Sequence, residues 1–188
     1  MPDSPQTFDA AQATAALAKV LKSQYHAALA MLREAIERCP DDLWLDARPR
    51  NAFWQIAYHT LFFAHAYLGD RVTFQPWAEH QRDVQHEDGI AGEPDPQSTL
   101  PLIPKPYTKE QTLRYWTFVD GRVDLALDTM DLRRRDSGFP RYPMSKLEHQ
   151  LVNLRHIQHH TAQLADRLRA ACDVNVTWRG KLRPEATS

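Results

Sequence analysis

The feature that most constrains this fold is a run of apolar residues spaced three and four apart between residues 9 and 38. This period places them on one face of a helix and does not match the two-residue alternation of a strand. The run predicts one long amphipathic helix, which ends before Pro40 because proline cannot continue it. The composition agrees, since 23 Ala and 20 Leu against 8 Val and 5 Ile favour helices over sheets.

Three further stretches have helical periodicity. The first, residues 52–68, follows Asn51 as a predicted N-cap and ends before Gly69. It is apolar on almost every face, so we expect it to be the most buried helix. The other two, residues 108–132 and 145–172, both begin with the spacing of a capping box.

The segment between the second and third predicted helices, residues 70–107, holds six prolines and is polar. It is too long for a tight turn and suits a crossover connection. A chain of 188 residues corresponds to about one domain. We therefore expect an all-α, single-domain four-helix bundle over residues 1–188, with a long crossover loop between helices two and three and a loosely docked tail after Asp173.

The charge balance limits the partners of the chain. Lys and Arg number 23 and Asp and Glu 24, so the net charge of -1 provides no field to hold nucleic acid or an anionic membrane. No apolar run approaches the about 18 residues of a membrane span, and the start lacks the pattern of a secretory signal. Cys39 and Cys172 form no CxxC pair. We expect a cytoplasmic protein with reduced thiols and no nucleic-acid or membrane partner.

Three of the nine histidines suggest a metal site. His156 and His160 are four residues apart on one helix, so they project from the same face and can share an ion. His59 lies within the apolar second helix, where a buried imidazole needs a partner that a metal would supply. Three imidazoles leave a coordination position open, as in catalytic sites. The alternatives are a chance HxxxH pair and a hydrogen-bonded core histidine at position 59.

Several other kinds of site are excluded. No Glu follows His156, so the HExxH pattern of zinc proteases is absent, and no Glu is followed three residues later by His, as in di-iron bundles. The chain has no nucleophile elbow, phosphate-binding loop or dinucleotide fingerprint. Cys39 and Cys172 fall near helix C-termini, where the helix dipole disfavours a thiolate. Neither cysteine is a good nucleophile candidate.

The remaining histidines have structural interpretations. His26 on the first helix is expected in the core or at an interface. His65 and His149 face helix neighbours and either line the pocket or lie at the polar surface. His80 and His86 fall in the polar connection and are expected to be solvated.

Two segments resemble the DinB-like (DinB/YfiT-like) superfamily of metal-binding four-helix bundles. They are Asn51-Ala-Phe-Trp-Gln-Ile-Ala-Tyr-His59 and Asn153-Leu-Arg-His156-Ile-Gln-His159-His160-Thr-Ala-Gln163. The resemblance covers nearly the whole chain, because it includes the single histidine on helix two, the long crossover and the HxxHHxxQ pattern on helix four. This combination is more specific than HxxxH alone.

The resemblance implies one divalent ion bound by His59, His156 and His160, with His159 and Gln163 in supporting or packing positions. Zn²⁺ is the default for three histidines, and Ni²⁺ and Fe²⁺ also accept imidazole. The better understood relatives are thiol-dependent transferases and isomerases, in which the metal activates a low-molecular-weight thiol such as bacillithiol or mycothiol. A homodimer is expected from the resemblance and from the 5 Trp, 6 Tyr and 7 Phe, which exceed the need of one small bundle.

Two functions remain open: an enzyme, or a non-catalytic metal-containing binding or structural module. No catalytic residue is identified from the sequence. For an enzyme we favour thiol transfer over metal-dependent hydrolysis. Three neutral ligands leave the ion its full charge, and the motif offers no Glu as a base. A thiol with a pKa of about 8.5 needs less help than water, which starts at about 15.7.

Overall fold

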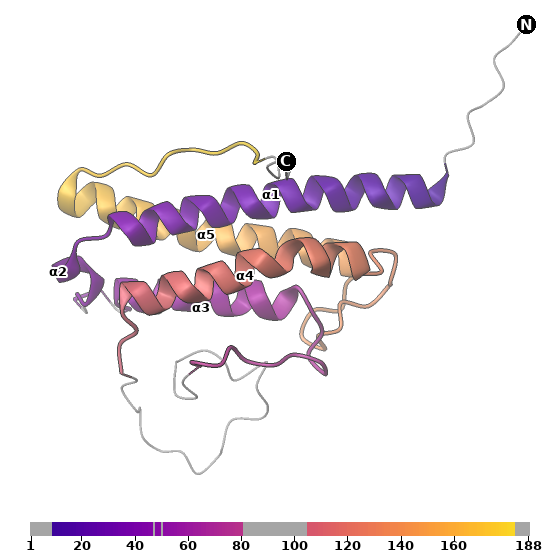
Figure 1. Cartoon of the computed structure of the whole chain (residues 1–188), viewed down its shortest axis with the longest axis horizontal. Helices are drawn as coiled ribbons and strands as arrows, with labels where there is room; N and C mark the ends of the chain where they lie inside the picture. The colour runs from indigo at the N-terminus through magenta and orange to yellow at the C-terminus, as the bar shows by residue number, and fades with distance from the viewer. Residues whose placement is uncertain (1–8, 47, 50, 81–104, 183–188) are drawn as a thin grey trace, which may run out of the picture.

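The computed structural model describes residues 9–46, 48–49, 51–80 and 105–182, and this part of the chain contains helices and no strand. In chain order the helices (Figure 1) are α1 (Ala10–Arg38), α2 (Asp41–Trp44), α3 (Phe53–Tyr67), α4 (Lys109–Thr129) and α5 (Lys146–Cys172). The all-α class predicted from the sequence is confirmed. The four long helices lie close to the four predicted ranges.

Side-chain caps explain where two of the helices begin. The Thr108 hydroxyl accepts a hydrogen bond from the backbone N–H of Gln111 at 3.1 Å, which starts α4. The Ser145 hydroxyl accepts one from the N–H of Glu148 at 3.2 Å, which starts α5. Each bond satisfies a donor that the first helical turn leaves without an intrahelical partner.

The structure differs from the sequence-based expectation at two helix boundaries and by one additional short helix. The N-cap of α3 is Ala52 instead of Asn51, and the Ala52 N–H donates to Oε1 of Gln55 at 2.7 Å. The helix α4 ends three residues earlier than predicted because Met130 is extended, with φ -73° and ψ 127°. The short helix α2 occupies the start of the segment predicted as a loop.

The four long helices form a bundle in which α1 and α3 each pack against both α4 and α5 (Figure 1). The shared ion implied for His59, His156 and His160 requires the second and fourth predicted helices to be neighbours, and they are, as α3 against α5. Within the bundle α1 and α5 run in one direction and α3 and α4 in the other. The shared direction of α3 and α4 is that expected for two helices joined by a long connection. Residues 81–104 of the predicted crossover lie outside the described residues.

The helix α3 is the most deeply buried of the four, as its apolar sequence predicts. All of its residues are buried except Gln55, His59 and Phe63. These three are spaced four apart and therefore form one stripe along the helix. His59 thus lies at the centre of the one part of α3 that has access to the surface.

After α5 the chain returns along α1 (Figure 1), as a docked tail. The Thr177 N–H donates to Glu34 at 3.0 Å, and Gln24 donates to the Gly180 carbonyl at 3.0 Å. Trp178, the one large apolar residue predicted for the tail, is 73% exposed. Polar contacts with α1, together with Val174 and Val176, which are partly buried against the core, hold this segment in place.

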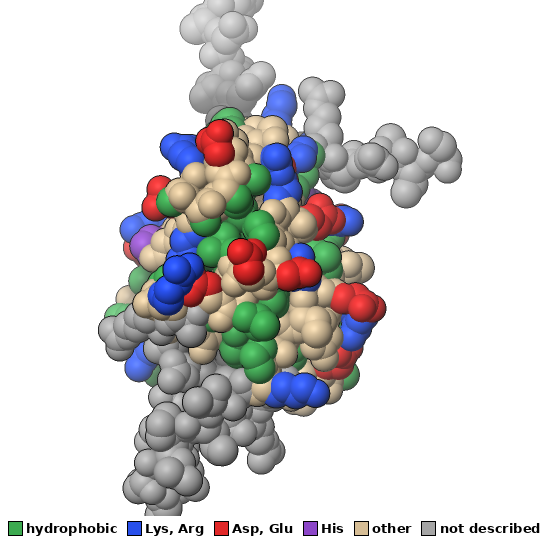
Figure 2. Space-filling model, turned by 90° about the vertical axis from the view of Figure 1, so that its left-hand side faces the viewer, with side chains coloured by type: hydrophobic (Ala, Val, Ile, Leu, Met, Phe, Trp, Pro, Cys, Tyr) green, Lys and Arg blue, Asp and Glu red, His purple; other side chains and the backbone are tan. Residues whose placement is uncertain are grey.

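The surface at one end of the bundle carries both signs of charge. Figure 2 shows basic and acidic side chains interspersed around apolar patches on the end where α2 lies. A face with mixed charges produces no extended field of one sign. Among the described residues, no helix has the length and apolar character required to cross a membrane.

Candidate metal centre

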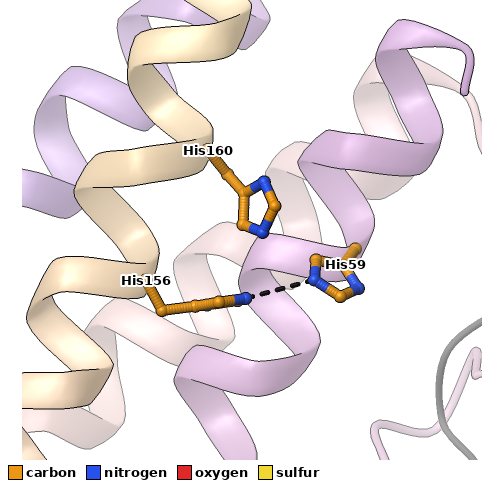
Figure 3. A group of neighbouring side chains, drawn as sticks. All are labelled: His59, His156 and His160. Carbon is orange, nitrogen blue, oxygen red and sulfur yellow. Dashed lines mark hydrogen bonds between the residues drawn. The ribbon is translucent and has the colours of Figure 1, made fainter.

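Three predicted histidines meet between α3 and α5. His156 and His160 lie one turn apart on α5, and His59 projects toward them from α3 (Figure 3). The Nε2 atoms of His156 and His59 are 3.1 Å apart. One ring nitrogen from each of the three residues lies within 4.8 Å of the other two. The packing of α3 on α5 thus brings together residues almost a hundred positions apart in the chain.

The spacing of these nitrogens fits a shared metal ion. Nitrogens bound to one zinc ion at about 2.0 to 2.1 Å are roughly 3 to 3.5 Å from each other. The pair formed by His59 and His156 already has this separation. The full set, within 4.8 Å, is slightly wider. In the described part of the chain this is the one group of three or more His, Cys, Asp or Glu that could hold an ion, and it contains no carboxylate.

The surroundings of His156 keep its imidazole neutral. Burial, with a smaller contribution from the neighbouring His160 and His159 rings, lowers the pKa of His156 to about 3. The charged form is disfavoured because few polar groups replace the water that it would lose. Neutral imidazole is the form that binds a metal ion, so His156 is ready to act as a ligand at neutral pH.

A glutamine fixes the orientation of His160. The Nδ1–H of His160 donates to Oε1 of Gln163 at 2.8 Å, which leaves the lone pair on Nε2. The amide nitrogen of Gln163 in turn donates to Nε2 of His159 at 3.2 Å. A hydrogen bond to the second ring nitrogen commonly sets the tautomer of a metal-binding histidine. His159 and Gln163 therefore lie where the resemblance expects supporting residues, and their role beside an ion stays a prediction.

A phenylalanine forms an apolar wall at the same place. The Phe63 ring centre lies 4.6 Å from that of His59 and 5.4 Å from that of His156. The sequence alone does not single out Phe63 as a site residue. Its spacing of four from His59 is the signal that could have identified it, because both belong to the accessible stripe of α3.

His26, His65 and His149 do not belong to this cluster. His26 of α1 contacts Asp120 and Asp124 of α4, at 2.8 and 3.4 Å. His65 and His149 are buried, so the expected placement at the polar surface is wrong, and the alternative that they line the pocket stays a prediction. Each is enclosed by aromatic rings.

The sequence predicts that two histidines of the polar connection, His80 and His86, are solvated. His80 is half-buried and its Nδ1 lies 2.5 Å from the hydroxyl of Tyr58, so its predicted solvation is wrong. His86, predicted as solvated, lies outside the described residues. The contact with Tyr58 places the start of the connection against α3.

The cysteines do not compete with the histidine cluster as a reactive site. Cys39 is buried at the end of α1, and burial raises the pKa of its thiol to about 12. Cys172 is the last residue of α5 and is exposed. Both thiols are free, and neither belongs to the group of potential metal ligands.

Comparison with known proteins agrees with the fold and the cluster. The family model of the DinB superfamily matches residues 24–164, which is most of the chain, and the chain therefore belongs to this superfamily. The matched region contains His59, His156 and His160. No curated protein and no solved structure matches the chain.

Proposed function

We propose that this protein is a metal-dependent enzyme that transfers a low-molecular-weight thiol to an electrophile. The observation that carries the proposal is the group of three imidazoles, His59, His156 and His160, with no carboxylate in it. Membership of the DinB superfamily is compatible with one bound divalent ion. Zn²⁺ is the default for this ligand set, and Ni²⁺ and Fe²⁺ are the other candidates.

The side chains around the site serve to hold and orient a cation. When bound, the ion would supply the positive charge that stabilises a thiolate at neutral pH. His156 stays neutral through burial, and Gln163 orients His160. The Phe63 ring packs against the His59 and His156 rings and provides an apolar contact beside them. The partial exposure of His59 leaves an approach for the thiol and the electrophile.

The absence of a carboxylate from the cluster favours thiol transfer over hydrolysis. A hydrolase that uses metal and water gains from a positioned base, usually Glu or Asp. In the described part of the chain no such residue belongs to the cluster. A thiol has a pKa of about 8.5, so a nearby cation is enough to deliver the thiolate.

The proposed reaction can be tested directly. Metal-loaded protein is mixed with a panel of low-molecular-weight thiols and a chloronitroaromatic electrophile, and the thioether is measured. The thiol gives its proton to solvent, the new sulfur–carbon bond forms, and chloride leaves with the electron pair of its bond to carbon. We expect conjugation that depends on both the metal and one thiol of the panel.

Two variants control this experiment. His59→Ala removes a proposed ligand and should abolish metal-dependent conjugation. His26→Asn removes a histidine that contacts Asp120 instead of the cluster, and should leave the activity intact. Metal-dependent ester or amide cleavage without conjugation would replace the proposal with a hydrolase. Loss of the fold on chelation, without either activity, would indicate a structural metal.

The assembly and compartment of the protein are part of the same proposal. We propose a homodimer in the cytoplasm, where its two free thiols would stay reduced. Light scattering at micromolar concentration measures the mass, and a monomer would refute the dimer. Cell fractionation tests the compartment.

A further inference from the structure

The inner face of α5 is polar in its first half, next to the histidine cluster. His149, Gln150 and Asn153 are all fully buried, at 0% exposure. Farther along α5 the buried residues are mostly apolar, including Ile157 and Leu164 at 0% exposure, with Thr161 as a buried polar exception. Buried polar side chains cost free energy unless they are hydrogen-bonded. The buried polar side chains of α5 are therefore expected to have hydrogen-bond partners.

Some of these polar groups have partners and others do not. Gln150 accepts from the Tyr25 hydroxyl at 2.8 Å and donates to the Tyr67 carbonyl at 3.0 Å. Among the described residues, however, no group bonds to Oδ1 of Asn153, to Nδ1 of His156 or to either ring nitrogen of His149. Each unsatisfied atom of this kind destabilises the folded state. In native proteins such atoms are commonly satisfied by internal water.

The amide nitrogen of Asn153 holds the side chain in a fixed position. Its Nδ2 donates to the Ala64 carbonyl of α3 at 3.1 Å, so its Oδ1 is directed by a bond between the two helices that carry the cluster. Asn153 and His156 are three residues apart and therefore neighbours on the face of α5. The unpartnered acceptor of Asn153 and the unpartnered ring nitrogen of His156 are thus both buried, on side chains that are neighbours along α5.

We propose that Asn153 is a positioning residue for His156, acting through one internal water molecule between its Oδ1 and Nδ1 of His156. The proposal rests on the metal site put forward above. The water accepts from the His156 Nδ1–H and donates to Asn153 Oδ1. This arrangement holds the hydrogen on Nδ1 and leaves the lone pair on Nε2, which faces His59.

The two α5 ligands would then be oriented in different ways. His160 has a direct acceptor, Gln163, near the surface. His156 has no direct acceptor in the described part of the chain and would use a water molecule in the interior. A buried water needs two or more polar partners, and His149 provides further polar atoms along the same face of α5. In this arrangement the buried polar residues of α5 serve to orient His156 as a metal ligand.

The test compares variants that keep or remove the acceptor. Asn153→Leu removes it, and Asn153→Asp keeps an oxygen at the same place. Thr161→Val is the matched control, because Thr161 is also buried on α5 with an unpartnered hydroxyl. Zinc affinity is measured by competition with a chelator, and the tautomer of His156 by ¹⁵N NMR of the metal-free protein.

We expect Asn153→Leu to weaken zinc binding by about 10- to 100-fold and to move the His156 hydrogen from Nδ1 to Nε2. Asn153→Asp should lose less affinity and keep the Nδ1–H tautomer, and Thr161→Val should match the wild type. Equal affinities and tautomers for Asn153→Leu and the wild type would overturn the proposal. So would an Asn153→Asp variant as weak as Asn153→Leu.

The metal-free measurement separates this proposal from the proposed function. If the wild type binds no metal, the proposed function fails, and the tautomer in the metal-free protein still tests Asn153. If the wild type binds metal and the tautomer does not depend on Asn153, only the positioning role fails. Thermal unfolding of each metal-free variant shows whether a loss of affinity reflects loss of the fold. A crystal structure without a water between the two residues would also refute the role.

Discussion

The pKa of a histidine shifts in opposite directions at two helix contacts, that of α1 with α4 and that of α3 with α5. Between α1 and α4, His26 lies 2.8 Å from a carboxylate oxygen of Asp120 and 3.4 Å from one of Asp124. The hydrogen bond to Asp120 raises the pKa of His26, and Asp124 adds to the effect. Between α3 and α5, burial lowers the pKa of His156 to about 3. The neighbours of each ring, and not the residue type, decide whether it carries charge.

This difference has a chemical consequence. Two carboxylates favour the charged form of His26, in which both ring nitrogens are donors and neither can bind a cation. A histidine among apolar and imidazole neighbours keeps a lone pair at neutral pH. The two helix contacts therefore separate a structural histidine from ligand candidates within one bundle, and four predictions test this separation.

The largest effect is expected on metal content. His156→Ala and His160→Ala should each reduce the bound ion from about one per chain to almost none, because two imidazoles do not hold an ion as three do. His26→Ala should keep its metal, since its ring contacts Asp120 instead. Elemental analysis of the purified proteins measures this. Metal retained at the wild-type level in both α5 variants would show that the cluster is not the site.

The second effect is stabilisation by the ion. Zinc at about 1,000 times its dissociation constant should add about 4 kcal/mol to the free energy of unfolding of the wild type, because it binds the folded chain. The same increment is expected for His26→Asn and none for His59→Ala. Denaturant unfolding with zinc and with chelator gives the values. An equal increment in His59→Ala would place the bound zinc elsewhere.

The third effect is a loss of stability in acid that originates between α3 and α5. Burial lowers the pKa of His149 to about 4 from an ordinary value of 6.5. The unfolded chain therefore binds a proton at this residue before the folded chain does, and stability falls as the pH decreases from about 6.5 toward 4. The loss from this residue is up to about 3 kcal/mol.

His149→Phe should remove that part of the pH dependence, since phenylalanine fills similar space beside Tyr67 and does not titrate. The measurement is the free energy of unfolding of the metal-free proteins from pH 7.5 down to pH 4.5. Curves that stay parallel over this range would contradict the prediction.

The smallest effect has the opposite sign and belongs to α1 and α4. The pKa of His26 is raised in the folded protein, so its contribution to stability is complete below the unfolded value of about 6.5. It is lost as the pH rises through the higher folded value. For a partly exposed pair the contribution is about 0.5 to 1 kcal/mol.

The stability difference between wild type and His26→Asn should therefore be largest near pH 5.5 and shrink toward pH 8.5, as measured by denaturant unfolding of the metal-free proteins. High salt should reduce it because the pair is partly exposed. A difference that grows with pH would mean that Asp120 does not hold the His26 ring in its charged form.

Local sequence patterns predict the helices well and the helix contacts only in part. Periodicity and capping boxes locate α4 and α5 because these signals lie within a few residues of each other. The short helix α2 is missed because Pro40 signals a break, whereas the structure uses Pro40 as the residue before a new turn. The environments of His65 and His149 could not be predicted, since the rings that enclose them include Phe118 and Tyr67, which come from distant segments.

In the candidate site too, local sequence patterns predict some features, and others depend on how the helices pack. The spacing of four between His156 and His160 follows from one helix and is evident in the sequence. The approach of His59 depends on how α3 packs on α5, which periodicity alone does not give. The resemblance to the DinB-like superfamily supplied that pairing. The chain of hydrogen bonds through Gln163 and the unpartnered atoms of Asn153 emerge only with side-chain positions.

The position of His59 and His156, 97 residues apart, also sets an order of events during synthesis. A ribosome adds about 5 to 20 residues per second, so α5 emerges roughly 5 to 20 s after α3. Until then a nascent chain offers one of the three proposed ligands and cannot retain an ion. Under the proposed metal site, only chains whose last helix has been synthesised and packed would bind the ion. The amount of bound metal would then equal the amount of fully synthesised and folded protein.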